Sequence, residues 1–208
     1  MSVYLGYDVL ELNYDRVGAI DERVERKASR LDNKTGKRFI DAESPAANPV
    51  RPFSWSAVGK VEKAALRAFL DARVGRAVPF WLPSFQWDLT LKEDLNSGVT
   101  IATVVWCRYR EQMFGTTGGR RHLALWPYGI GTPMQFYKIA DADDPGNGVT
   151  ESLTLSPGAT QTYLKDTTVL SFLKLCRLED DLVSVRYLGG DVAVATIQVR
   201  ELPLEAPV

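Results

Sequence analysis

One segment of this chain carries hydrophobic residues at a helical period. Between residues 58 and 73, apolar positions recur three or four residues apart, the spacing that places side chains on one face of an α-helix. We therefore predict one amphipathic helix there. Its apolar stripe consists of Val61, Ala65, Phe69 and Ala72. Ser54 or Ser56 is a candidate N-cap, and Gly75 suits the left-handed residue that follows a helix.

Most of the remaining chain consists of short segments rich in β-branched and aromatic residues, which is typical of strands. These segments cover residues 97–109, 121–128, 134–140, 149–155, 169–178, 182–188 and 191–199. Turn signals separate them at Gly189-Gly190, Asn147-Gly148 and Glu179–Asp181, and a further hairpin is expected within 26–39. The pattern predicts a mainly β fold, a sandwich or barrel with the helix covering an open end or face.

Length and charge narrow the class of protein. We expect residues 1–208 to form one domain with an extended loop near 110–121. The net charge of −1 gives no support to a nucleic-acid binder driven by bulk positive charge. Acidic residues interrupt the N-terminal segment, so it does not match a signal peptide, and no apolar run approaches the length of a membrane span. We expect folding in a cytoplasm and no membrane partner.

Few residues have the spacing of a catalytic or metal site. His122 is the only histidine, and no Gly-x-Ser-x-Gly elbow accompanies it, so we expect an ordinary strand or loop residue. Cys107 and Cys176 lie in apolar segments, and we expect two buried thiols, with a disulfide as the less favoured alternative. The sequence predicts no enzyme, no metal and no cofactor.

Two polar turns share features with ligand-binding loops but lack their spacing. Residues 141–148 contain three aspartates, but Pro145 and Ser152 stand where an EF-hand needs ligands. We expect an acidic hairpin turn, with a weak cation site as the alternative. Residues 115–121 lack the phosphate-loop pattern, and we expect a flexible loop, with contact to a neighbouring subunit or to DNA passing through a channel as the alternative.

The densest aromatic segment of the chain begins in the predicted helix and runs from Phe69 to Leu89. It contains Phe80, Trp81, Phe85 and Trp87, and in an extended chain the last two would share a face. Aromatic side chains dominate cores and subunit interfaces, which favours such a role for this segment. A sugar-binding platform is the alternative.

The same segment and the C-terminus resemble a family of tailed-phage tail proteins. The matching features are Phe53-Ser-Trp55, the helix, Phe69-Leu-x-Ala-Arg-x-Gly-Arg76, Pro79-Phe-Trp-x-Pro-Ser84, Asp88-Leu89, Ser171–Asp181 and Glu201-Leu-Pro-Leu-Glu205. The chain thereby resembles the distal tail proteins, which are tail-tip ring components of long-tailed bacteriophages and gene transfer agents.

This resemblance implies a tail-tube-like β-sandwich or split barrel with one helix. It also implies a ring, expected to be hexameric, at the tail tip of the virion. The implied partners are further copies of the chain, the tail tube protein, the hub or fibre protein and the tape-measure protein, with DNA in transient contact as it passes. A carbohydrate-binding β-sandwich for host attachment is the alternative function, and a tail-associated hydrolase lacks a recognisable nucleophile.

The resemblance assigns structural or interface roles to a set of motif residues. They are Arg73, Gly75, Arg76, Phe80, Trp81, Pro83, Trp87 and Asp88. The two arginines are expected to cap the last helix carbonyls or to pair with Asp71 or Asp88, with contact to a neighbouring subunit as the alternative.

Overall fold

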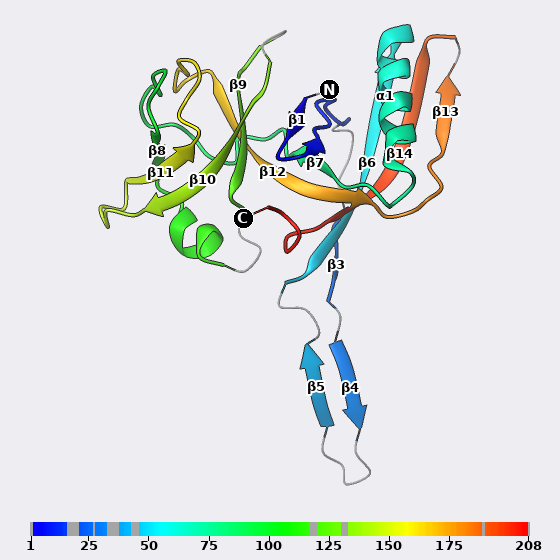
Figure 1. Cartoon of the computed structure of the whole chain (residues 1–208), viewed down its shortest axis with the longest axis horizontal. Helices are drawn as coiled ribbons and strands as arrows, with labels where there is room; N and C mark the ends of the chain where they lie inside the picture. Colours follow the sequence, from blue (N-terminus) through cyan, green and yellow to red (C-terminus); the bar gives the residue numbers. More distant parts are fainter. Residues whose placement is uncertain are drawn as a thin grey trace. The chain divides into compact units, whose positions relative to one another are not determined.

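The computed structural model describes residues 2–15, 21–26, 28–32, 38–42, 46–116, 120–129, 133–188 and 190–207. Over these residues the fold is mainly β, and an antiparallel sheet network carries one long helix, α1 (Gly59–Arg73) (Figure 1). The predicted fold class and the predicted helix are therefore confirmed.

The chain divides into two compact units. The first comprises Met1–Glu11, Trp81–Lys174 and Pro207–Val208, and the second comprises Leu12–Phe80 and Leu175–Ala206. One strand, β12 (Thr168–Leu178), begins in the first unit and ends in the second. The expected organisation as one domain stays a prediction.

The first unit is built on an antiparallel sheet. Its strands are β8 (Ile101–Val105), β9 (His122–Pro127), β10 (Gln135–Asp143), β11 (Thr150–Ser156) and the first part of β12. They pair in the order β12–β9–β10–β11–β8, and β1 (Val3–Tyr4) forms a separate hairpin with β2 (Tyr7–Asp8). Buried leucines and tyrosines, among them Leu123, Leu153, Tyr137 and Tyr163, make the core cluster of this unit. Burying each large apolar side chain contributes on the order of 1.5–3 kcal/mol.

The second unit is built on another set of antiparallel strands. They are β3 (Arg23–Glu25), β6 (Asn48–Val58), β14 (Val192–Glu201) and β13 (Val185–Leu188). They pair in the order β3–β6–β14–β13, and the last residues of β12 pair with the other end of β14. Helix α1 lies along β6 and β14 (Figure 1). Two further strands, β4 (Ala28–Asp32) and β5 (Arg38–Ala42), form a two-stranded sheet of their own.

The buried face of α1 differs from the predicted stripe. The helix buries Leu66, Phe69 and Arg73, whereas Val61 is 83% exposed and Ala65 and Ala72 are exposed as well. Of the predicted stripe only Phe69 is correct. Leaving valine or alanine exposed at the other three positions costs little free energy, because these side chains are small. The helix therefore turns toward the sheet the face that carries the larger side chains.

The helix ends also differ in part from the prediction. Ser54 and Ser56 lie within β6, and Val58 occupies the N-cap without a side-chain cap; its N–H donates to the Glu62 carboxylate at 2.9 Å. At the C-terminal end, Val74 already takes the left-handed conformation (φ 50°) and Gly75 follows with φ 62°. The left-handed glycine was predicted correctly, but it is the second such residue.

The predicted hairpins are present as strand pairs. β10 pairs with β11 and β13 with β14, on either side of the predicted turns, while β4 pairs with β5 and the tip of that hairpin lies outside the described residues. Residues 179–184 connect β12 to β13, which both pair with β14. The loop expected at 110–121 begins as a single-turn π-helix, η1 (Arg110–Phe114).

Candidate assembly surfaces

The first part of the aromatic segment packs inside the second unit. The rings of Phe69 and Phe80 meet edge to face, with centroids 5.0 Å apart, and both side chains are buried. Arg73 is buried too: its guanidinium lies 4.7 Å from the Phe69 ring centroid, and its Nη1 donates to the Pro79 carbonyl at 3.1 Å. Arg73 therefore ties the helix end to the chain that leaves it.

Arg76 contacts Asp181 rather than Asp71 or Asp88. Its backbone N–H donates to Asp181 Oδ1 at 3.0 Å, and its Nε lies 3.6 Å from Oδ2. A Cβ added at Gly75 would lie 2.4 Å from the same Oδ1. Glycine is required here both by this close approach and by the positive φ.

The middle of the aromatic segment belongs to the first unit. Trp81 and Pro83 are buried in β7 (Phe80–Pro83), and the Trp81 indole N–H donates to the Tyr4 carbonyl at 2.8 Å. The His122 ring packs against the indole with centroids 4.7 Å apart. Trp81 is therefore a core residue of its own unit.

The last part of the aromatic segment is a turn instead of a strand. The Asp88 carboxylate accepts the Phe172 N–H at 2.7 Å and the Ser84 hydroxyl. Phe85 has φ 53° and is buried, whereas Trp87 is 44% exposed. The expectation that Phe85 and Trp87 share a face is wrong, because the left-handed residue breaks the alternation of an extended chain.

Two aromatic side chains form an exposed pair on the first unit. The Trp87 and Tyr128 rings have centroids 6.3 Å apart, and Tyr128 is 74% exposed. An exposed aromatic pair can receive an apolar side chain or the face of a sugar ring. Of the motif residues, Trp87 is the most exposed aromatic.

His122 is buried between the two ends of the chain within the first unit. Its Nε2 donates to the Pro207 carbonyl at 2.9 Å, and its Nδ1 accepts from the Tyr4 hydroxyl at 3.1 Å. Burial lowers the pKa of the imidazole to about 4, helped by Lys138 and Arg121 and opposed by the Pro207 carbonyl. His122 is thus a neutral strand residue, and a strand or loop position is what the sequence predicted. Its hydrogen bonds to residues near both ends of the chain were not predicted.

Glu151 is a buried carboxylate that sequence reasoning missed. It lies in β11 with no exposed surface, and its two oxygens accept the N–H groups of Cys107, Tyr109 and Arg110 at 2.9–3.1 Å. These bonds hold the turn that starts η1, which explains why the predicted loop begins as a helix. Alternation within β11 was the available signal, since Glu151 shares the buried phase of Leu153 and Leu155.

The two cysteines differ in environment. Cys176 is buried as predicted, but Cys107 is exposed, because it lies in the turn that Glu151 holds and not in a strand. Both are free thiols. Although the residue is exposed, desolvation of its thiol group, followed by the nearby Glu151 carboxylate, raises the pKa of the Cys107 thiol.

Aspartates of the acidic turn at 141–148 form ion pairs and hydrogen bonds with other residues of the protein. Asp143 pairs with Arg110, and Asp144 accepts the Trp106 indole N–H at 3.1 Å and the Gly146 N–H at 2.8 Å. Within the described part of the chain, no group of three or more His, Cys, Asp or Glu side chains is placed to hold a metal ion.

The strands of the second unit leave two edges unpaired among the described strands. β3 pairs only with β6, and β13 pairs only with β14. Apolar side chains are exposed at both edges, including Val24 (57%) at β3 and Leu182, Tyr187 and Leu188 at β13. Such edges are a ready template for pairing with another chain.

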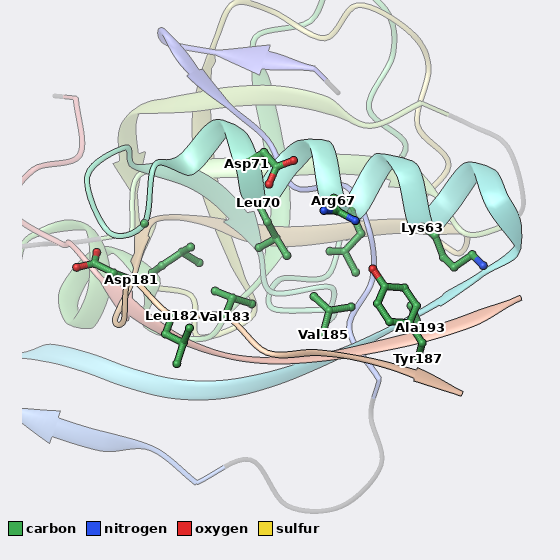
Figure 2. Close-up of a pocket in the computed structure, with 13 residues that line it drawn as sticks. Lys63, Arg67, Leu70, Asp71, Asp181, Leu182, Val183, Val185, Tyr187 and Ala193 are labelled. Atoms are coloured by element: carbon green, nitrogen blue, oxygen red, sulfur yellow. The ribbon is translucent and has the colours of Figure 1, made fainter. Parts of the chain in front are cut away.

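A groove of about 580 Å³ lies between α1 and the β13 edge. Leu70, Val183, Val185 and Tyr187 line it, together with Lys63, Arg67, Asp71 and Asp181 at its rim. Figure 2 shows the Leu70 side chain directed from the helix toward the strand side, where Val183 and Val185 lie. The groove therefore combines an apolar floor with charged ends.

Ion pairs hold β3 onto its unit. The Arg200 guanidinium forms two bonds to Glu179, at 2.5 and 2.6 Å, and a third to Glu25 of β3 at 2.8 Å. These bonds to Arg200 hold the pKa of Glu179 below its usual value. Arg51 of β6 binds Glu22, just before β3, at 2.5 Å.

Comparison with known proteins gives no family assignment. No family model matches the chain, and no curated protein matches it. Within the described residues, no helix has both the length and the apolar character to cross a membrane.

Proposed function

We propose that this chain is a structural ring component of the tail tip of a long-tailed phage or gene transfer agent. The ring joins the tail tube to the hub or central fibre and lets DNA pass. The motif resemblance in residues 53–89, 171–181 and 201–205 supports this proposal. The arrangement of these residues as packing and turn-forming groups is compatible with a role in assembly rather than catalysis.

One structural observation carries the ring part of the proposal: among the described strands, those of the second unit have two unpaired edges of different composition. A closed ring needs heterologous contacts, in which two different patches of each subunit meet around a rotation axis. β3 and β13 supply two such patches, and their exposed apolar residues are suited to burial in a permanent interface.

The separate β4–β5 hairpin adds support. A two-stranded hairpin is marginally stable in water by itself, so it is expected to gain stability from a partner. In the proposed assembly the available partners are neighbouring copies, the tail tube protein, the hub or fibre protein and the tape-measure protein.

The ring proposal is tested by native mass spectrometry and light scattering. We expect the purified protein to form one closed oligomer, expected to be a hexamer, either alone or with its tail tube and hub proteins. A chain that stays monomeric under all these conditions would contradict the proposal.

The exposed Trp87–Tyr128 pair favours a second candidate, a carbohydrate-binding module for host attachment. Trp87→Ala is expected to abolish binding on a glycan array if this function holds, while Trp106→Ala serves as a tryptophan control elsewhere on the unit. Unchanged binding in Trp87→Ala, or no glycan binding by the native protein, rejects this candidate.

A further inference from the structure

Strand β3 lies at the edge of the second unit with little apolar packing to hold it there. Arg23 and Val24 are exposed, Val24 at 57%, and Glu25 is half-buried. The strand pairs with β6 at only three positions, and the central one contains Pro49, which has no N–H to donate. Burial of apolar surface therefore contributes little to the attachment of β3, and its backbone ladder is short.

Ion pairs hold β3 from both faces of the sheet. Arg51 of β6 donates twice to the Glu22 carboxylate, at 2.9 and 2.5 Å, and Arg200 of β14 donates to Glu25 at 2.8 Å. Residues paired across antiparallel strands share a face, and successive residues alternate between faces. Val50 pairs with Arg200, so Arg51, the next residue along β6, lies on the opposite face. The two arginines therefore bind β3 from opposite sides.

These ion pairs remain in contact with solvent. The exposed fractions of the four side chains lie between 20% for Arg51 and 38% for Glu22. The attraction between partly exposed charges is screened by salt and falls as the ionic strength rises. The attachment of β3 is therefore expected to depend on ionic strength more strongly than the pairing of strands that bury apolar side chains.

Both arginines have a second carboxylate that does not belong to β3. Nη1 of Arg51 lies 3.7 Å from Glu201, and Arg200 donates two hydrogen bonds to Glu179. If β3 leaves, each arginine keeps this other partner. Detachment of β3 therefore leaves neither guanidinium as an uncompensated charge in the sheet, which lowers its cost.

We propose that β3 is a salt-sensitive latch: its ion pairs hold it on β6 at low ionic strength, and their screening lets β3 leave and opens the outer edge of β6 at residues 48–50. With the latch closed the sheet ends at β3, and with the latch open it ends at β6. The ion pairs thus decide which strand a partner meets at this edge. The inference goes beyond the proposed ring and does not depend on it, because both states belong to one subunit.

Hydrogen–deuterium exchange of the full chain, followed by mass spectrometry, tests the latch. Raising sodium chloride from about 50 mM to about 1 M shortens the screening length to roughly 3 Å. We expect the amides of residues 21–26 to exchange at least about fivefold faster at the higher concentration.

β13 is the internal control for this salt series. It is the opposite edge strand of the same unit, and its charged residue, Arg186, forms no ion pair with a described residue. Exchange in β13 is expected to change less than about twofold between the two salt concentrations.

Removing the two carboxylates should imitate high salt. In Glu22→Gln/Glu25→Gln, residues 21–26 should exchange at about 50 mM salt as fast as in the native protein at about 1 M, and added salt should have little further effect. Glu205→Gln is the matched control, because its carboxylate pairs with Arg177 at 2.8 Å and not with β3. This control should keep the salt dependence of the native protein.

The outcomes decide the proposal whether or not the chain forms a ring. Exchange at 21–26 that does not respond to salt, or that accelerates only as much as exchange in β13, overturns the latch. So does a double variant that exchanges like Glu205→Gln at low salt. If the double variant does not fold, the salt series on the native protein still decides.

Spin labels give a second readout of the same opening. In a Cys107→Ser background, Val24→Cys and Gln198→Cys place labels at exposed positions on β3 and β14. Double electron–electron resonance should show one narrow distance distribution at about 50 mM salt and a second, longer and broader one at about 1 M. An unchanged distribution at both concentrations would overturn the proposed latch.

Discussion

At the scale of single residues, two buried polar groups govern the first unit. Glu151 satisfies three backbone N–H groups of one turn, and His122 joins a strand to both chain termini. Neither belongs to a recognisable motif. The hydrogen-bond partners of each residue lie far away in the sequence. The role of each residue therefore follows from the fold and not from its neighbours in the chain.

Removing the Glu151 carboxylate should destabilise the first unit. Glu151→Ala leaves three N–H groups without their acceptor, which we expect to lower the free energy of unfolding by about 3 kcal/mol. Urea unfolding followed by circular dichroism measures this change. Glu111→Ala, at an exposed position in η1, is the control; equal stability of the two variants would contradict the role assigned to Glu151.

The lowered pKa of His122 predicts a loss of stability in acid. Above about pH 6.5 the imidazole is neutral in both the folded and unfolded states, so it contributes no pH dependence. Between that value and the folded pKa of about 4, only the unfolded state gains the proton. Stability therefore falls as the pH falls through this window, by on the order of 3 kcal/mol in total.

The measurement is the unfolding free energy of the native protein and of His122→Asn at pH 7 and pH 4.5. The native protein should lose about 2–3 kcal/mol more than the variant between these values. An identical loss in both proteins would show that His122 is not the group responsible.

At the scale of elements, the hydrophobic pattern predicted that α1 is a helix but did not predict which face of the helix is buried. Leu66→Ala is expected to lower the free energy of unfolding by about 2–5 kcal/mol, since it leaves a cavity beneath the helix. Val61→Ala, at an exposed position of the predicted stripe, should change it by less than about 0.5 kcal/mol. Denaturant midpoints of the two variants decide between the faces, and a larger effect at Val61 would contradict the structure.

Local signals predicted the elements that depend on neighbouring residues. The helix, the β10–β11 and β13–β14 hairpins and the β4–β5 pair each follow from contiguous periodicity and turn residues. Three features could not be predicted in this way, because each depends on a contact distant in sequence. The buried face of α1 is selected by β6 and β14, and the turn at Phe85 is held by contacts with Ser171 and Phe172 of β12. The start of η1 is held by Glu151 of β11. The groove beside α1 also required the fold, since α1 and β13 are far apart in the chain.

At the scale of the whole molecule, the aromatic segment that resembles a tail-protein motif is divided between two units. Phe69 and Phe80 pack in the second unit, while Trp81 packs in the first. Packing alone therefore explains the aromatic residues of this motif, without any ligand. Over one short stretch of chain the motif supplies core residues to both units. Among the described residues, the exposed surfaces that we propose for partners include the β3 and β13 edges, the groove beside α1 and the Trp87–Tyr128 pair.

The central claim, that this chain is a tail-tip ring component, is tested most directly by locating it in assembled particles. Electron microscopy of particles that carry the chain, labelled with gold-conjugated antibody against it, would be the measurement. We predict label at the distal end of the tail, where a ring closes the tube. Label elsewhere on the particle, or particles with complete tails that lack the chain, would contradict the account.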